Sequence, residues 1–191
     1  MADSGATAAV ARFVAETPVE AIPGEVLHEA KRTLINVLAV GLSASVDASV
    51  GMLESWDGGG SSDGGVASVI GRGRVGIERA ALLNGYVAHL QDYDDTHFPT
   101  ILHPSAPTWP AALAAAEQRH ASGLETLAAF AIGAEVACRV AMSVHPWHYD
   151  AGWHITGTTG VFGAVASAAR LLGLSSAVGE QALGLAGTHA A

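Results

Sequence analysis

One stretch of the chain, residues 84–105, concentrates groups that could exchange protons or bind an ion: carboxylates, imidazoles, hydroxyl groups and prolines. Within it His89, Asp92 and Thr96 follow at steps of three and four, a spacing that predicts one shared helix face, with Asp94 pointing elsewhere. Asp92 and Thr96 could then contact a single ligand. The alternative is a solvated turn, although aspartates at the C-terminal end of a helix oppose its dipole unless another group compensates for them.

A second unusual stretch, residues 145–160, holds three histidines and two tryptophans, a composition typical of a loop that lines a binding site. This stretch leads into a helix predicted to begin near Thr158 or Thr159. Glycines such as Gly160 would leave the backbone N–H groups of its first turn open to an anion. A carboxylate ligand would suit that helix end.

The two stretches together offer an acid and a base. His103 and His154 are the candidates, because imidazole is the side chain best placed to exchange protons near neutral pH. A metal site, as in a metal-dependent hydrolase, is the alternative, and its possible ligands are His97, His103, His145, His148, His154 and residues 92–95. The spacing disfavours it, since the chain has neither H-E-x-x-H nor C-x-x-C. We therefore expect no metal ligands.

Helices have to position these groups, because apolar residues recur at helical spacing along most of the chain. A short helix is predicted up to about Glu16, and the clearest helix opens at Pro23, where the missing N–H costs little. Its apolar stripe comprises Val26, Ala30, Leu34, Val37, Leu38 and Gly41. A further amphipathic helix enters the first stretch at residues 83–90, and Pro99 and Pro104 prevent it from continuing far.

Three more helices are predicted in the second half. One follows Pro110 and is rich in alanine, which allows neighbouring helices to approach closely. The next is opened by a capping box, Ser122 with Glu125, and carries a favourably ordered pair of Glu135 and Arg139. Ser175 is the predicted cap of the last helix.

The middle of the chain holds the only plausible strand, residues 66–70. It runs into residues 71–76, which match the spacing G-x-G-x-x-G of a dinucleotide-binding turn. No alternation of strands and helices follows, so a tight, basic turn is the better interpretation. The Gly/Ser/Asp-rich residues 57–65 just before the strand are predicted to be a flexible connection.

Composition narrows the functional classes. Half of the residues are hydrophobic, 14% are charged and the net charge is −9, with Lys31 the only lysine. A chain without a basic stripe is a poor partner for nucleic acid. So much apolar surface with so little charge indicates contact with a second chain or another domain.

The sequence also bears on cellular location. Apolar runs are interrupted before the ~18 residues of a membrane span, so no membrane partner is expected. The first residues lack the basic start and apolar block of a signal peptide, which favours a cytoplasmic protein. The single cysteine, Cys138, lies among apolar helix residues and is interpreted as a small buried side chain rather than a nucleophile.

Several motifs in combination resemble the MmgE/PrpD family, which includes 2-methylcitrate dehydratases, cis-aconitate decarboxylases and an iminodisuccinate epimerase. The resemblance extends over nearly the whole chain. The motifs are Leu83-Asn-Gly, His89-Leu-Gln-Asp-Tyr-Asp-Asp-Thr96, His103-Pro-Ser105, Glu135-Val-Ala-Cys-Arg139 and Gly152-Trp-His-Ile-Thr-Gly-Thr-Thr-Gly-Val-Phe-Gly163.

The resemblance implies an all-α fold of the helical-bundle type with at most one short strand, usually dimeric, that acts on di- or tricarboxylic acids without a metal or organic cofactor. It implies that His103 is a principal proton donor or acceptor and that His154 polarises or protonates the substrate from the other loop. Asp92 is the third catalytic candidate. Thr96, Ser105 and Thr158 are the candidate substrate-binding residues.

The chain also departs from the family. Members are considerably longer and carry a separate lid domain, with the lysines that bind the substrate carboxylates in the part that has no counterpart here. We therefore expect residues 1–191 to form a single, incomplete all-helical domain without the lid. The expected activity is that of a cofactor-independent, 2-methylcitrate dehydratase-like lyase, with cis-aconitate-type decarboxylation or iminodisuccinate-type epimerisation as alternatives. The rival of another class is a non-catalytic fragment or one subunit of a split enzyme, and the expected partner is a second copy or a complementing chain.

Overall fold

The computed structural model describes residues 5–56 and 65–190, and the fold is all-α with one two-stranded hairpin, as the sequence predicts. The first half contains α1 (Ala6–Glu16), a 3-10 turn at Val19–Ala21, α2 (Gly24–Ala44), α3 (Ala48–Trp56), β1 (Ala67–Ser68), β2 (Arg74–Val75) and α4 (Ile77–His89). The second half contains α5 (Ser105–Arg119), α6 (Gly123–Val144), α7 (Trp147–Asp150), α8 (Ile155–Leu171) and α9 (Ser176–Ala186).

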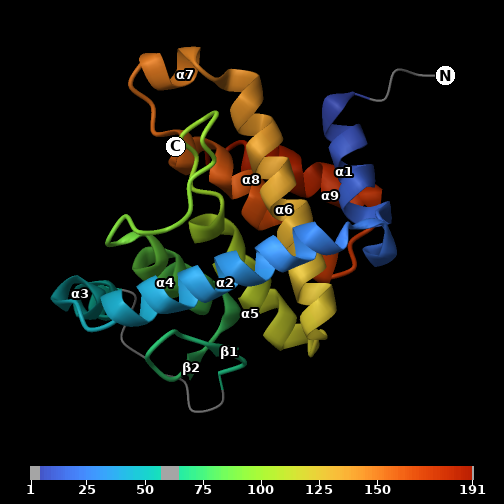
Figure 1. The fold of residues 1–191 in the computed structure, drawn as a ribbon. Helices are drawn as coiled ribbons and strands as arrows, with labels where there is room; N and C mark the ends of the chain where they lie inside the picture. The colour runs from blue at the N-terminus through green and yellow to red at the C-terminus, as the bar shows by residue number, and fades with distance from the viewer. Residues whose placement is uncertain (1–4, 57–64, 191) are drawn as a thin grey trace.

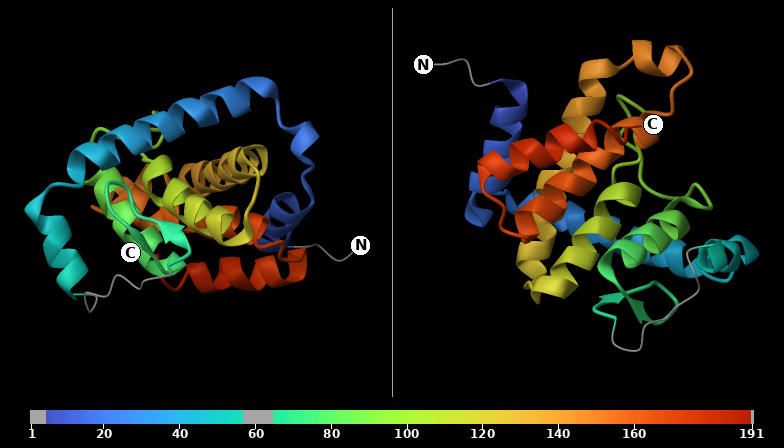
Figure 2. Two further views of the ribbon diagram at one scale, coloured as in Figure 1. Left: turned by 90° about the horizontal axis from the view of Figure 1, so that it is seen from below. Right: turned by 180° about the vertical axis from the view of Figure 1, so that it is seen from behind.

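The helices form layers around α5 and α6. Helix α2 crosses one side of the molecule, α8 and α9 cover the opposite side, and α7 projects at one end (Figure 1). The view from below separates α2 from α9 along opposite edges, with α5 and α6 between them (Figure 2). The two loops predicted to carry chemistry, residues 90–104 and 145–154, thus leave the bundle near the same end.

An aromatic pair joins three of these helices in the core. The ring of Trp109 on α5 stacks on Phe130 of α6, with centroids 4.0 Å apart and planes within 6°. Trp109 is fully buried, and its Nε1 donates a hydrogen bond of 2.9 Å to the Thr33 hydroxyl on α2. The indole therefore has both its apolar face and its polar group satisfied, which fixes α2 against the central layer.

Small residues bring α6 and α8 into close contact. A Cβ atom added to Gly133 would lie 2.6 Å from the carbonyl oxygen of Gly163, and one added to Gly163 would lie 2.7 Å from the Thr108 hydroxyl oxygen. Real side chains do not approach so closely, so only glycine fits at either position. These two glycines are thus required by packing, and this close contact fixes α8 against α6.

Several local predictions are confirmed. The capping box at Ser122 and Glu125 is present, and the Ser175 hydroxyl accepts a hydrogen bond from the backbone N–H of Val178. Glu135 and Arg139 form an ion pair of 2.7 Å. These signals depend only on neighbours within four residues, which is why sequence alone suffices to place them.

Two predicted helix boundaries are wrong. Helix α5 begins at Ser105 and contains Pro110, although the sequence suggested that it would follow this proline. Helix α8 begins at Ile155, earlier than Thr158 or Thr159. Pro110 is tolerated although it cannot hydrogen-bond the Ala106 carbonyl, because its ring is fully buried and packing compensates for the lost bond.

A single strand was predicted at residues 66–70. The structure instead has a small antiparallel hairpin, in which Ala67 of β1 pairs with Val75 of β2. The glycine-rich residues between the strands form a tight turn, with Gly71 at a φ of 71°, so the interpretation as a turn is confirmed. Of the predicted flexible connection, only Gly65 lies within the described residues.

Helix α6 alone among the described helices is long and apolar enough to cross a membrane. Half of its apolar stretch is buried inside the fold, where it packs against α8, α5 and α2. This degree of burial is what the core helix of a bundle requires.

Candidate active site

The first chemically rich stretch, residues 84–105, begins within the last turns of α4, which ends at His89. The backbone N–H of Asp92 bonds the His89 carbonyl at 3.1 Å, and Asp92 adopts a left-handed φ of 56°. The chain therefore reverses here and does not continue as a helix. The prediction that His89 and Asp92 share a helix face while Asp94 points elsewhere is wrong, because the helical period no longer applies beyond His89.

Asp94 lies at the centre of the site. Its side chain has no exposed surface, and both carboxylate oxygens lie 3.0 Å from Nδ1 of His89. The hydrogen bond that His89 donates to Asp94 raises the pKa of His89, the charges of Asp94 and Asp92 add to this effect, and burial of the ring opposes it. His89 is therefore protonated over a wider pH range than a free histidine.

His103 approaches the same carboxylate from the other end of the loop. Its side chain is 13% exposed, its Nδ1 lies 3.4 Å from Asp94 Oδ2, and its Nε2 lies 3.8 Å from Asp92 Oδ1. The buried Nδ1 has no hydrogen-bond partner at this distance. The backbone N–H of His103 donates to the Thr156 hydroxyl at 3.0 Å, which links this loop to the start of α8.

His154 completes a row of three imidazoles. It is the residue that precedes α8, and its ring stacks on His89 with centroids 5.9 Å apart. The ring of His103 meets His89 on edge at 5.0 Å. The structure thus brings the two sequence-predicted histidines together, with His89 between them.

The other sequence-predicted site residues are more dispersed. Asp92 is 76% exposed and contacts the group at its edge, with Oδ1 3.8 Å from Nε2 of His103. Thr96 is exposed on the loop and does not line the cavity described below. Thr158 contacts His148, whose Nε2 lies 2.8 Å from the Thr158 hydroxyl oxygen.

Ser105 is fully buried and faces a carboxylate rather than the open site. Its hydroxyl donates to Asp95 at 2.7 Å and its backbone N–H donates at 3.1 Å. Burial raises the pKa of Asp95 and the nearby charge of Asp94 raises it further, whereas the bonds from Ser105 and the charge of His103 lower it. Ser105 therefore secures the loop that carries Asp94.

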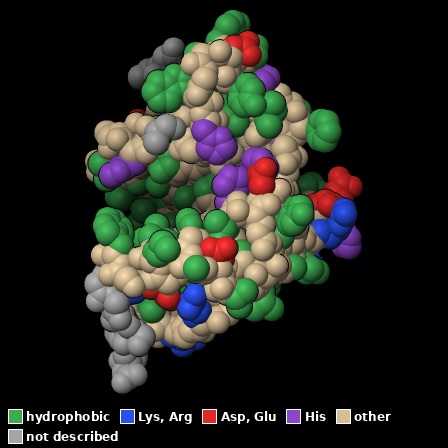
Figure 3. Space-filling view, turned by 90° about the vertical axis from the view of Figure 1, so that its left-hand side faces the viewer, with side chains coloured by type: hydrophobic (Ala, Val, Ile, Leu, Met, Phe, Trp, Pro, Cys, Tyr) green, Lys and Arg blue, Asp and Glu red, His purple; other side chains and the backbone are tan. Residues whose placement is uncertain are grey.

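A cavity of about 680 Å³ opens beside the imidazoles, between α4, the first turn of α5 and the start of α8. Its walls are mainly apolar, and the lining residues with polar side-chain groups are Tyr86, His89, His154 and Thr156. On this face of the molecule histidines and an acidic side chain gather at the edge of a hollow lined by hydrophobic side chains (Figure 3). Neither lysine nor arginine lines the cavity within the described part of the chain.

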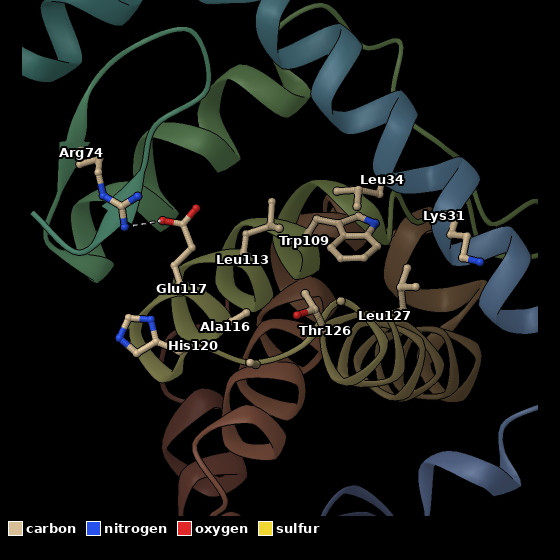
Figure 4. A pocket seen from close by; sticks show the side chains of 12 residues that line it. Lys31, Leu34, Arg74, Trp109, Leu113, Ala116, Glu117, His120, Thr126 and Leu127 are labelled. Carbon is tan, nitrogen blue, oxygen red and sulfur yellow. Dashed lines mark ion pairs between the residues drawn. The ribbon is translucent and has the colours of Figure 1, made fainter.

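A second cavity, of about 540 Å³, lies between α2, the hairpin, α5 and α6. Its floor is formed by Trp109 and leucines, with Lys31 at one end and the 3.2 Å ion pair of Arg74 with Glu117 at the other (Figure 4). His120 is the single imidazole at its rim. The second cavity offers no partnered acid and base, so we place the chemistry at the first.

The geometry also bears on a metal site and on a nucleophilic thiol. The group His89, Asp92, Asp94 and His103 has ligand atoms within 4.8 Å of one another, but His89 and Asp94 are in direct hydrogen-bond contact, and we do not assign the group to a metal. Cys138 is partly buried, and burial raises the pKa of its thiol to about 11. A thiol that remains protonated near neutral pH is a poor nucleophile.

Comparison with known protein families identifies the family of the chain. The sequence model of the MmgE/PrpD N-terminal domain matches residues 8–191. The chain belongs to the MmgE/PrpD family. The matched region includes both loops and all three imidazoles, so the predicted resemblance is confirmed over nearly the whole chain.

Relatives in this family carry decarboxylase names. The chain is 34% identical over 201 residues to "Cis-aconitate decarboxylase-like protein oryM" of Aspergillus oryzae, covering 98% of this chain and 41% of that protein. It is 29% identical over 198 residues to a cis-aconitate decarboxylase of Aspergillus terreus, covering 99% and 40%, and 36% identical over 116 residues to that of Homo sapiens, covering 58% and 24%. It spans about two fifths of the length of the two fungal relatives.

Sequence reasoning missed three residues of the site. Asp94 was assigned to the wrong side, His89 was noted only for its spacing, and Thr156 was not considered. A signal for Asp94 was available, since a carboxylate with histidines nearby in the sequence has possible partners if it is buried. Thr156 becomes visible only when the contact across 53 residues to His103 is known.

Proposed function

We propose that this chain forms the imidazole and carboxylate wall of a lyase active site that decarboxylates a tricarboxylic acid of the cis-aconitate type. The observation that carries the proposal is the row of three imidazoles, of which His89 and His154 line an open cavity and His103 lies next to His89, with the buried Asp94 carboxylate beside His89 and His103. The names of the relatives support the reaction class.

The chemistry needs a positioned proton. When a carboxylate leaves as carbon dioxide, the electron pair of the broken C–C bond remains on carbon and is delocalised through the adjacent double bond into a remaining carboxylate. The resulting carbanion must then take a proton on carbon from an acid, and an imidazolium supplies one near neutral pH. We assign this role to His103 or His154.

The remaining candidates have supporting parts in this proposal. Asp92 and Thr96, which are exposed on the loop, would contact substrate at the rim. Ser105 acts through Asp95, and Thr158 acts through His148. No metal or organic cofactor has a step in the mechanism.

Dehydration of 2-methylcitrate is the second candidate. It requires a base that removes a proton next to a carboxylate and an acid that protonates the departing hydroxyl group. The site offers more than one imidazole for these two tasks.

The active enzyme needs positive charge that this wall does not provide. A polycarboxylate and its developing enolate require cations, and the described residues that line the cavity include neither lysine nor arginine. We therefore propose that further protein completes the site, either a complementing chain or sequence such as the relatives carry beyond the matched region. A chain without this completion would fold and remain inactive.

The test uses proton NMR of the purified chain with cis-aconitate and then 2-methylcitrate, after light scattering has established its oligomeric state. The same measurement follows on the enzyme completed by its complementing protein. His103→Ala and His154→Ala should abolish turnover in the completed enzyme, whereas His28→Ala, which removes an exposed imidazole on α2, should not. Normal turnover in both active-site variants would refute the proposal.

A further inference from the structure

We propose that Asp94 is a positioning residue for two imidazoles and that His89 is a third proton-carrying side chain of the site. The inference rests on the proposed lyase function, which assigns protons only to His103 and His154. It is carried by the geometry around a single carboxylate, and it can be tested on the chain by itself.

The Asp94 carboxylate is committed to imidazole nitrogens. Its side chain has no exposed surface, and its contacts in the described structure are Nδ1 of His89, at 3.0 Å from each oxygen, and Nδ1 of His103, at 3.4 Å from Oδ2. A carboxylate without water remains ionised only where N–H groups compensate for the lost hydration. Those N–H groups have to come from the two imidazoles.

This arrangement fixes which nitrogen of His89 exchanges its proton. With Nδ1–H held by Asp94, the nitrogen left to exchange a proton is Nε2, and the ring is part of the cavity wall. In the acid form Nε2–H donates its proton to the carbon of the substrate, the N–H electron pair stays on Nε2, and Nδ1–H remains bonded to Asp94. The orienting carboxylate thus keeps one tautomer before and after transfer.

His103 can share the same partner. Its Nδ1 is buried without a hydrogen bond, and a movement of a few tenths of an ångström would bring it within bonding distance of Asp94 Oδ2. Asp94 therefore has two imidazole partners: His89, which is hydrogen-bonded to it, and His103, which lies just beyond bonding distance. The groups that face His89 are Asp92 and Asp94 from the loop, His103 before α5 and His154 before α8.

The experiment is two-dimensional ¹H–¹⁵N NMR of the imidazole rings, recorded as a pH titration on the folded chain. For the parent protein we expect His89 to hold its proton on Nδ1 when neutral and to titrate above its ordinary pKa. Asp94→Asn should lower the pKa of His89 and move the neutral proton to Nε2, because the new amide can donate to Nδ1. Asp150→Asn, which removes an exposed carboxylate on α7, should change neither.

A second variant keeps the test decisive if Asp94→Asn fails to fold. In His89→Gln the carboxylate loses its bonded imidazole, and the neutral His103 ring should hold its proton on Nδ1, because this nitrogen takes the vacated partner. A parent spectrum with the neutral His89 proton on Nε2 would overturn the inference. So would a pKa of His89 that Asp94→Asn leaves unchanged.

Turnover distinguishes this inference from the proposed function. If the completed enzyme is active, His89→Gln should lower kcat about 100-fold or more with a smaller change in KM. Full activity of this variant would refute the role of His89 and leave the lyase proposal standing. Absence of turnover in the parent enzyme would refute the lyase proposal, whereas the NMR result would still decide the tautomer.

Discussion

Gly133→Ala tests whether the contact between α6 and α8 is as close as the structure indicates. The new Cβ atom would lie 2.6 Å from the Gly163 carbonyl oxygen, 2.8 Å from Thr108 Cγ2 and 2.9 Å from Ser167 Cβ. Two of these neighbours, the backbone of α8 and the side chain of Ser167, belong to the helix whose N-terminal end carries His154. The substitution should therefore push α8 away from α6 and disturb the row of imidazoles.

The expected magnitude follows from two opposing terms. Alanine in place of glycine inside a helix stabilises the folded state by about 1 kcal/mol. Overpacking of a filled core costs about 1–3 kcal/mol, and a clash with backbone favours the upper end. The net loss in the free energy of unfolding should be roughly 1–2 kcal/mol, which corresponds to a fall in Tm of roughly 2–8 °C for a chain of this length.

Thermal unfolding followed by circular dichroism measures this loss. Gly51→Ala on α3 is the matched control, because nothing lies within 4 Å of its new Cβ atom and only the helix-propensity gain applies. The control should therefore equal or exceed the parent in Tm. A Gly133→Ala protein as stable as the control would show that α6 and α8 are not in backbone contact.

Three further predictions concern charge, reactivity and assembly. Because the pKa of His89 lies above the ordinary value of 6.5, its pairing with Asp94 should stabilise the fold fully below pH 6.5 and lose this effect as pH rises through the folded-state pKa. Urea unfolding of the parent and Asp94→Asn should thus differ more at pH 5.5 than at pH 9, and an equal difference would contradict the pairing. Cys138, with a pKa of about 11, should resist alkylation at pH 8 until the protein is unfolded, and rapid labelling of the native chain would show that the thiol is accessible as thiolate. The outer face of α2 exposes Ile35 (67%) and Leu42 (59%) in a segment without charged residues, and we expect a second copy of the chain to pack there. Leu42→Glu should then convert the dimer to a monomer, as measured by light scattering. A dimer that this substitution leaves unchanged would place the interface elsewhere.

Local signals account for what the sequence predicts correctly. The cap at Ser122 and the turn at Gly71 depend on a few neighbouring residues, so composition and spacing determine them. Helical periodicity predicts most of the helices, whereas the all-α class of fold was implied by the family resemblance. His103 and His154 were paired because imidazoles suit proton exchange, and the family resemblance implied the same pair; spacing alone cannot bring residues 51 positions apart together.

Predictions failed where tertiary contacts override local rules. Helical spacing assigned Asp92 to the site and Asp94 away from it, but the left-handed backbone at Asp92 ends the period, and the buried position is taken by Asp94. Pro110 was expected to precede a helix, yet burial of its ring allows it inside one. Both errors arise from the same cause, since burial decides which of several neighbouring residues faces the interior.

The negative charge of the aspartates in this site affects both substrate binding and the protonation of the imidazoles. Asp92, Asp94 and Asp95 lie close to the imidazoles, and a substrate carboxylate 4 Å from an uncompensated aspartate would be repelled by about 4 kcal/mol at an effective dielectric constant of 20. Each protonated imidazole offsets one such charge. Cations supplied by the completing protein would attract the substrate, but they would also lower the pKa of the imidazoles and so remove the protons that the reaction needs. The buried Asp94 carboxylate opposes this effect, because it is held within 3.4 Å of two imidazoles where solvent and substrate do not reach it. In the proposed enzyme, Asp94 therefore allows a site rich in positive charge to retain an acid.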